Sequence, residues 1–137
     1  LGLRHSHLRE MQHIAGLAMP PVFTPILCDM YSGMSVSLPL QNRMLRGEPT
    51  AEDIWEMLSG YYEGQKLVRV APFGGTEPRL NSGTFANSSV LEITVCGHEE
   101  QTLLTARFDN LGKGVAVAAV QNLNLMLGFP ETEGIPL

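Results

Sequence analysis

The sequence predicts an α/β (α+β) fold, with a mixed, mostly antiparallel sheet and helices on one face. Three segments alternate apolar and polar residues with a period of two, and a four-residue turn joins two of them. Segments between and after these strands carry apolar residues at helical spacing. A length of 137 residues is usual for one domain, so we expect 1–137 to form a single domain.

The chain opens with a helix that is followed by a strand. A short helix is expected over 7–15, and Gly16 is expected to end it. An extended segment between prolines, 22–27, comes next. The clearest strand is 34–41, where one face is apolar and the other polar. Pro39 predicts that the end of this strand lies at a sheet edge or strand terminus, since proline donates no ladder hydrogen bond.

A second helix and a short strand fill the middle of the chain. Thr50 can cap a helix over 51–63, with acidic residues near its positive end. A short strand is expected at 67–71. Residues 72–89 are rich in Gly, Pro, Ser and Asn, and irregular stretches of that length in compact domains are usually functional or mobile.

A hairpin and an apolar helix complete the chain. Strands are expected at 90–96 and 102–108, with the turn 97–100 between them. A last helix over 113–127 is apolar almost all round. Such a helix has to be covered on several sides.

Polar residues form one line on this apolar helix. Lys113, Gln121 and Asn124 share a narrow face, while Asn122 points the other way. Buried amides cost free energy unless they are paired. We therefore expect this line to have hydrogen-bond partners.

Composition and charge argue against several classes of function. A net charge of −5, with nine scattered Lys and Arg, argues against nucleic-acid binding. The longest apolar run near the C-terminus, 115–120, is too short to cross a membrane. No hydrophobic segment follows residues 1–4, so we expect no signal peptide. Cys28 and Cys96 are far apart and form no Cys-x-x-Cys pair, which favours a reducing cytoplasm.

The stretch His-Ser-His-Leu-Arg-Glu at 5–10 is the first candidate for chemistry. His7 and Glu10 share a helical face, and a carboxylate one turn from an imidazole can orient it for acid–base work. A metal site is not expected, because two histidines four apart around a Glu, the commonest catalytic zinc spacing, are absent. By pattern alone, a solvated helix start is the favoured interpretation.

Two other features are weaker candidates. Cys28 precedes Asp29, whose charge disfavours a thiolate, and Cys96 has the pattern of a small buried or half-buried strand residue. Neither is expected to be a nucleophile. Gly-Lys-Gly at 112–114 lacks the phosphate-loop pattern and instead predicts a turn of special geometry into a tightly packed helix.

Three stretches of the chain carry a family resemblance. Asp-Asn-Leu-Gly-Lys-Gly at 109–114 is followed by Ala-Val-Gln-Asn-Leu-Asn-Leu-Met-Leu-Gly at 119–128. Phe-Thr-Pro at 23–25 precedes Gly-Met at 33–34, and 5–11 is His-Ser-His-Leu-Arg-Glu-Met. In this order and spacing the stretches resemble motifs of the N-acetyl-gamma-glutamyl-phosphate reductases, the NADPH-dependent enzymes of arginine biosynthesis.

The resemblance implies a two-domain enzyme that ends in a catalytic and dimerisation domain like that of glyceraldehyde-3-phosphate dehydrogenase. We expect this domain to form a homodimer or homotetramer. A cysteine of the upstream part attacks the acyl phosphate substrate, N-acetyl-gamma-glutamyl phosphate. The cofactor NADP, as NADPH, then delivers hydride to the thioester, which gives N-acetylglutamate 5-semialdehyde. The residues that bind NADP lie mostly upstream of this chain.

The resemblance also assigns roles to residues of this chain. By position, His5 is the catalytic acid and base, and His7 and Glu10 are the accompanying residues that position substrate and imidazole. Lys113 is a further candidate for a substrate contact. The structural signature of the last helix comprises Gly114, Gln121, Asn122 and Asn124.

The chain departs from the family motifs at several positions. Where the family has Arg, Pro, His and Arg, this chain has Ser6, Arg9, Ile26 and Ser32. Some cationic substrate contacts are then missing or come from Lys113 or Arg43. A related semialdehyde dehydrogenase that acts on aspartyl or aminoadipyl phosphate is therefore an alternative.

No Gly-x-x-Gly-x-x-Gly turn and no Pro-Gly-Cys occur in the sequence. We therefore expect the nucleotide domain, a Rossmann domain, and the nucleophile to lie upstream of Leu1. The helix 113–127 is expected to pack on that Rossmann domain. The isolated chain is expected to be inactive. We also expect self-association through the sheet, whose apolar face exceeds what two or three helices cover. A non-catalytic dimerisation module that kept only the fold is the remaining alternative.

Overall fold

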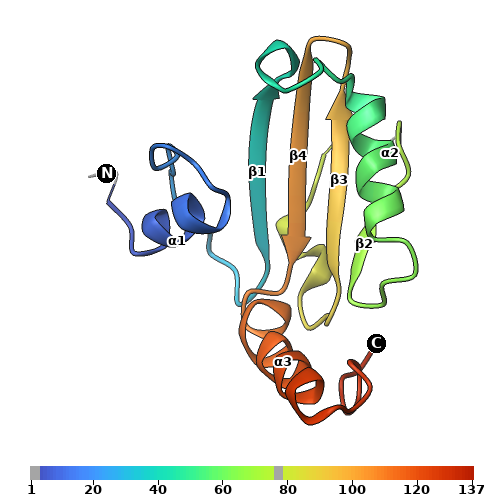
Figure 1. Cartoon of the computed structure of the whole chain (residues 1–137). Coiled ribbons are helices and arrows are strands. Elements are labelled where there is room, and N and C mark those ends of the chain that lie inside the picture. Colours follow the sequence, from blue (N-terminus) through green and yellow to red (C-terminus); the bar gives the residue numbers. More distant parts are fainter. Residues whose placement is uncertain (1–3, 76–78) are drawn as a thin grey trace.

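Figure 1 shows the computed structural model, which describes residues 4–75 and 79–137. Across these residues one sheet is formed in the order β1-β4-β3-β2, by the strands β1 (Met34–Gln41), β2 (Val68–Val70), β3 (Leu91–Gly97) and β4 (Gln101–Phe108). Around it lie the helices α1 (His7–Ile14), α2 (Ala51–Tyr61) and α3 (Val117–Leu127). The predicted fold class is confirmed.

The sheet is mixed and mostly antiparallel, as predicted. Strand β4 pairs antiparallel with both β1 and β3, and β2 pairs parallel with β3. The hairpin between β3 and β4 turns at residues 98–100, which places the two strands side by side. The parallel pair needs a long connection, and the residues between Val70 and Leu91 supply it.

The two faces of the sheet differ in chemistry, because successive side chains of a strand point to opposite sides. Register places on one face Met34, Val36, Leu38, Ile93, Val95, Leu104 and Ala106. The same register places on the other face Ser35, Ser37, Glu92, Thr94, Thr105 and Arg107. Helix α2 packs on the apolar face: Ala51 and Ile54 are buried, and a Cβ on Gly97 would lie 3.1 Å from the Ala51 Cβ.

A capping box fixes the start of α2 where the sequence predicts it. The Asp53 N–H donates to Thr50 Oγ1 at 3.1 Å, and the Thr50 N–H and hydroxyl donate to Asp53 Oδ2 at 2.8 and 2.6 Å. The Thr50 hydroxyl is the main cause that lowers the pKa of Asp53. The helix ends at Tyr61, slightly before the expected residue 63.

A short 3₁₀ turn, η2 (Ser82–Phe85), covers part of the polar face of the sheet. The Phe85 ring is buried, and the guanidinium carbons of Arg69 and Arg107 lie 5.2 and 5.4 Å from its centroid. Glu92 accepts hydrogen bonds from Arg69 Nε at 3.0 Å and from Arg107 Nη2 at 2.5 Å. Part of the predicted irregular stretch is therefore a structural cover.

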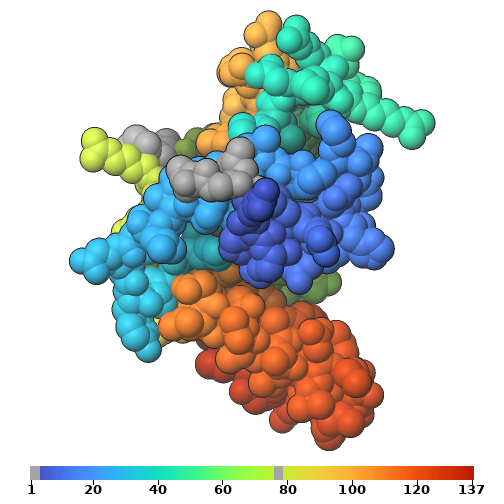
Figure 2. Space-filling view, turned by 90° about the vertical axis from the view of Figure 1, so that its left-hand side faces the viewer, coloured from blue at the N-terminus to red at the C-terminus, as the bar shows by residue number. Residues whose placement is uncertain are grey.

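Strand β1 is the edge of the sheet, as Pro39 predicts. Its apolar side chains stay in contact with solvent: Met34, Val36 and Leu38 are 40%, 42% and 52% exposed. Helix α1 lies off this edge and buries none of its residues (Figures 1 and 2). Of the helices in the described residues, α2 lies over a face of the sheet, while α1 lies to the side of β1 and α3 lies beyond the end of the strands (Figure 1).

The last helix begins later than expected, because its first turn is π-helical. In η3 (Gly112–Ala116) the Gly114 N–H donates to the Asp109 carbonyl at 2.9 Å, and the Ala116 N–H donates to the Leu111 carbonyl at 3.3 Å. Regular α-helix follows from Val117 and stops at Gly128, whose φ is 74°. None of the helices described here is long and apolar enough to cross a membrane.

The apolar surface of α3 has no cover within the described part of the chain. The exposed side chains on and beside it are Val115, Val120, Leu123, Leu125, Met126, Leu127 and Phe129. Exposed apolar patches of this kind mark surfaces that contact another protein or domain.

Gly33, at the start of β1, cannot accept a side chain. Its φ is +116°, and a Cβ there would lie 2.6 Å from the Ser82 carbonyl oxygen. We expect Gly33→Ala to lower the free energy of unfolding by about 3 kcal/mol or more, because backbone strain and a clash with main chain act together. Urea unfolding followed by circular dichroism measures it.

Gly16→Ala is the matched control, because φ there is +62° and a Cβ would meet nothing within 4 Å. Its expected cost is about 1–2 kcal/mol, the price of a left-handed residue alone. Equal losses in the two variants would contradict the close approach of turn and loop at Gly33.

Candidate functional site

The His-Ser-His motif and the Phe-Thr-Pro motif meet in space. The ring of His5 lies 4.8 Å from that of His7 and 5.1 Å from that of Phe23, both edge to face. The His7 N–H donates to His5 Nδ1 at 3.3 Å. Since Nδ1 accepts, the neutral His5 ring carries its proton on Nε2. His5 is exposed, so this donor is accessible to a ligand.

The other polar residues of α1 do not close around the histidines. Glu10 and His13 are exposed on the helix, and no hydrogen bond or ion pair among the described residues joins Glu10 to His5 or His7. Within 4–75 and 79–137, no group of three or more His, Cys, Asp and Glu side chains is arranged to hold a metal ion.

The polar line on the last helix has its partners in the C-terminal residues. Lys113 Nζ donates to Gln121 Oε1 at 2.7 Å, and Gln121 Nε2 donates to Glu131 Oε1 at 2.5 Å. Asn124 is buried, and its Nδ2 donates to the carbonyls of Glu131 and Glu133 at 3.1 and 2.9 Å. The expected hydrogen-bond partners therefore exist, and these bonds hold residues 131–133 against α3.

Lys113 is engaged within this line. Burial lowers the pKa of Lys113, and the nearby Glu131 carboxylate opposes that effect. Gly114 lies against Phe108, since a Cβ there would be 3.2 Å from the Phe108 ring, so a side chain at this position would require the ring to shift slightly. Asn122 is exposed away from the line, as its helical position predicts.

A buried carboxylate that sequence reasoning missed lies at the junction of β4 and α3. Asp109 is 2% exposed and accepts hydrogen bonds from Ser32 Oγ at 3.3 Å, from the Leu111 N–H at 2.7 Å, from the Gly112 N–H at 2.9 Å and from the Asn87 N–H. The Gly112 N–H is the main cause that lowers the pKa of Asp109, while burial opposes it. An Asx-type turn signal, Asp-Asn before Gly112, was the available clue.

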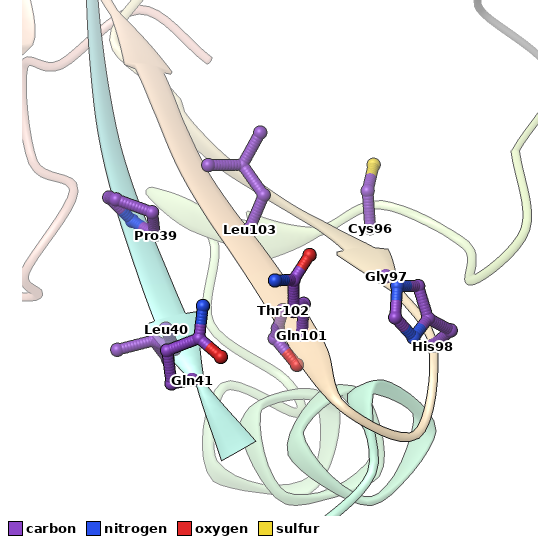
Figure 3. Close-up of a pocket in the computed structure, with 9 residues that line it drawn as sticks. All are labelled: Pro39, Leu40, Gln41, Cys96, Gly97, His98, Gln101, Thr102 and Leu103. Carbon is purple, nitrogen blue, oxygen red and sulfur yellow. The ribbon is translucent and has the colours of Figure 1, made fainter. Parts of the chain in front are cut away.

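A cavity of about 510 Å³ lies at the other end of the sheet, by the hairpin (Figure 3). Gln41, Cys96, His98, Gln101 and Leu103 are among its lining residues. The prediction that Cys96 is buried or half-buried is wrong, since this cysteine is exposed. It lies on the polar face at the hairpin end, and η2 covers that face only near the opposite end of the strands (Figure 1). None of the predicted site residues lines this cavity.

Comparison with known proteins decides the family. Residues 1–110 match the family model of the semialdehyde dehydrogenase dimerisation domain. The chain belongs to this family. The match ends at Asn110, so the π-turn and α3 lie beyond it.

Curated relatives of this dimerisation domain match almost the whole chain. An N-acetyl-gamma-glutamyl-phosphate reductase 2 of Nostoc sp. is 43% identical over 140 aligned positions, which cover 96% of this chain and 43% of the relative. An N-acetyl-gamma-glutamyl-phosphate reductase of Trichormus variabilis is 41% identical over 96% of this chain and 43% of its own length. The N-acetyl-gamma-glutamyl-phosphate reductase 2 of Pseudomonas putida is 41% identical over 98% of this chain and 44% of its own length. The chain thus spans less than half of these relatives.

The lowered pKa of Asp109 predicts how the free energy of unfolding of the dimerisation domain depends on pH. Hydrogen bonds hold the pKa of Asp109 below its usual value, so the ionised form stabilises the fold above the pKa of the unfolded chain, near 4. That contribution is lost as the pH falls through the lower pKa of the folded state. We expect Asp109→Asn to lower the free energy of unfolding by about 2 kcal/mol at pH 7 and by much less at pH 3. Urea titrations at both pH values measure it, and an equal deficit at both would contradict the prediction.

Proposed function

We propose that this chain is the C-terminal catalytic and dimerisation part of an N-acetyl-gamma-glutamyl-phosphate reductase. One observation carries the proposal: relatives of that name are 41–43% identical to the chain over 96–98% of its length. In this proposal a nucleotide-binding domain and a nucleophilic cysteine precede the chain. The pairing of the His-Ser-His and Phe-Thr-Pro motifs at His5 and Phe23 supports it.

His5 is the proposed acid and base of this chain. The overall reaction reduces an acyl phosphate to an aldehyde and releases phosphate, with NADPH as the reductant. The His7 N–H orients the imidazole through Nδ1, which leaves the Nε2 proton to be shared with the oxygen of the reacting carbonyl. His7 and Glu10 lie on the exposed side of the same segment, where a substrate can reach them.

NADP is assigned to the upstream domain, because the glycine turn of this chain does not fit a cofactor phosphate. The N–H groups of Leu111 and Gly112, which a phosphate would need, donate to the Asp109 carboxylate. A second negative charge there would face Asp109 directly.

A related acyl phosphate is the second candidate substrate. Ser32, where the resembling family has Arg, is buried and donates to Asp109, so it offers no cationic contact. Ile26 is 81% exposed, and it stands where the resemblance implies His. These departures favour a comparison of acetylglutamyl, aspartyl and aminoadipyl phosphates as substrates of the whole enzyme.

A chimera tests the proposed function. The part of the Nostoc reductase that precedes the matched region is fused to this chain, and NADPH oxidation by N-acetyl-gamma-glutamyl phosphate is followed. We expect the chimera to turn over and the 137-residue chain alone to be inactive. His5→Gln in the chimera is expected to lower kcat by about 10²–10⁴-fold, because acid–base catalysis by a positioned histidine contributes that much.

His98→Gln is the matched control. His98 Nδ1 accepts the Glu100 N–H at 3.3 Å, the same local geometry as at His5, but it lies in the hairpin turn. The control is expected to keep full activity. Turnover by the isolated chain, or an unchanged kcat in His5→Gln, would refute the assignment.

Self-association through the apolar face of the sheet is proposed for the same domain. A dimerisation domain implies an oligomer, and the exposed Met34, Val36 and Leu38 of β1 offer an apolar strip on one face of the sheet. A homodimer or homotetramer formed there would bury this strip.

Sedimentation velocity of the isolated chain tests this interface. We expect a dimer or tetramer for the natural chain and a shift of the equilibrium toward monomer by about tenfold or more for Leu38→Asp, because a charge would be buried in the contact. Ser37→Asp, one residue away on the opposite face, is the control and leaves the mass unchanged. A monomer for the natural chain would contradict the proposal.

A further inference from the structure

Three segments that are distant in sequence meet at the carboxylate of Asp109. Ser32 precedes β1, Asn87 follows η2, and Leu111 and Gly112 open the last helix; each donates a hydrogen bond to this group. A second cavity lies beside Asp109, and Tyr31 is the other titratable side chain that lines it. No ion pair of Asp109 with Lys, Arg or His occurs among the described residues. Hydrogen-bond donors alone therefore balance the buried charge.

The neighbouring Asn110 completes the contact from the same side. Its Oδ1 accepts the Gly33 N–H at 2.8 Å, next to the Ser32 hydroxyl that binds Asp109. On its other side Gly33 abuts η2, since a Cβ would lie 2.6 Å from the Ser82 carbonyl oxygen and 3.0 Å from the Gly83 Cα. The turn at 31–33 is thus fixed between β4 and η2.

This turn is where the segment that carries His5 joins the sheet. Helix α1 buries none of its residues, and Ile26 and Leu27 are 81% and 96% exposed. The same segment touches the loop through Met30, whose Sδ lies 3.7 Å from Ser82 Oγ. The position of the His5 segment against the sheet is therefore set largely at residues 30–33. The same carboxylate sets where the π-turn and α3 begin.

We propose that Asp109 and Asn110 form a positioning clamp, which fixes the His5 segment and α3 together relative to the sheet. Asp109 is then a positioning residue for the reaction, and this functional part rests on the role proposed for His5 above. An Asn at position 109 would place an N–H₂ group against N–H donors, so Asp109→Asn keeps the size of the side chain while it opens the clamp.

Two native cysteines allow a direct test in the natural chain. Cys28, in the segment that leads to the clamp, and Cys96, on β3, are both free and exposed. Spin labels on both report the distance between that segment and the sheet by double electron–electron resonance, with unlabelled protein in excess to suppress distances between copies. We expect one narrow distance distribution for the natural chain and a distribution at least twice as wide for Asp109→Asn.

Asp53→Asn is the matched control, because Asp53 also accepts main-chain and hydroxyl hydrogen bonds but lies exposed at α2. Its distribution should equal that of the natural chain. Hydrogen exchange separates positioning from general instability: in Asp109→Asn the amides of Gly33, Asn87 and Gly112 should lose protection at least tenfold, while those of the β3–β4 hairpin keep theirs. Should Asp109→Asn not fold, Asn110→Ala and Ser32→Ala each remove one contact and are measured in the same way, with a smaller widening expected.

Kinetics of the chimera give an independent readout. Asp109→Asn is expected to lower kcat about 10–100-fold with the KM for NADPH unchanged within twofold, since a displacement of about 1 Å costs that much and the cofactor lies on the upstream domain. A narrow Cys28–Cys96 distribution in Asp109→Asn would overturn the clamp. An altered distribution with unchanged kcat would overturn its role in the reaction, whereas an inactive natural chimera would count against the proposed function and leave the distance test to decide the clamp.

Discussion

The buried carboxylate of Asp109 constrains the whole end of the domain where β1 begins and α3 leaves the sheet. An ionised group that is 2% exposed needs several donors, and here they come from Ser32, Asn87, Leu111 and Gly112. These donors belong to three separate stretches of the chain. If one stretch moved away, the buried carboxylate would lose a hydrogen bond. The turn before β1, the loop after η2 and the π-turn into α3 are therefore held as one unit.

Each face of the sheet is covered over only part of its area, the polar face by η2 and the apolar face by α2. On the polar face, Glu92 and Arg107 form an ion pair at 2.5 Å, both nearly buried, and Phe85 of η2 lies against the guanidinium groups. Breaking such a pair by removing one partner typically costs about 3–5 kcal/mol, so this cover is firmly held. On the apolar face α2 covers β3 and its neighbours but leaves Met34, Val36 and Leu38 of β1 exposed. This exposed apolar surface is the one through which self-association of the dimerisation domain is proposed.

The candidate site was predictable in its parts but not in its connections. The two motifs at His5 and Phe23 are recognisable in the sequence, yet nothing in their spacing indicates that the rings lie 5.1 Å apart. The line of Lys113, Gln121 and Asn124 was predicted to need partners, and the structure supplies them from Glu131 and Glu133, a few residues beyond the helix. The role of Asp109 could not be predicted, because its donors Ser32 and Asn87 lie far from it in the sequence.

The sequence by itself determined the local elements of this protein. Period-two alternation defined β1, β3 and β4, Thr50 defined the start of α2, and motif resemblance singled out His5, because each of these signals acts within a few residues of the chain. The tertiary structure alone decided which carboxylate joins the segments and that Cys96 is exposed. These outcomes depend on which distant segments supply donors or cover, and that is settled only when the segments pack together.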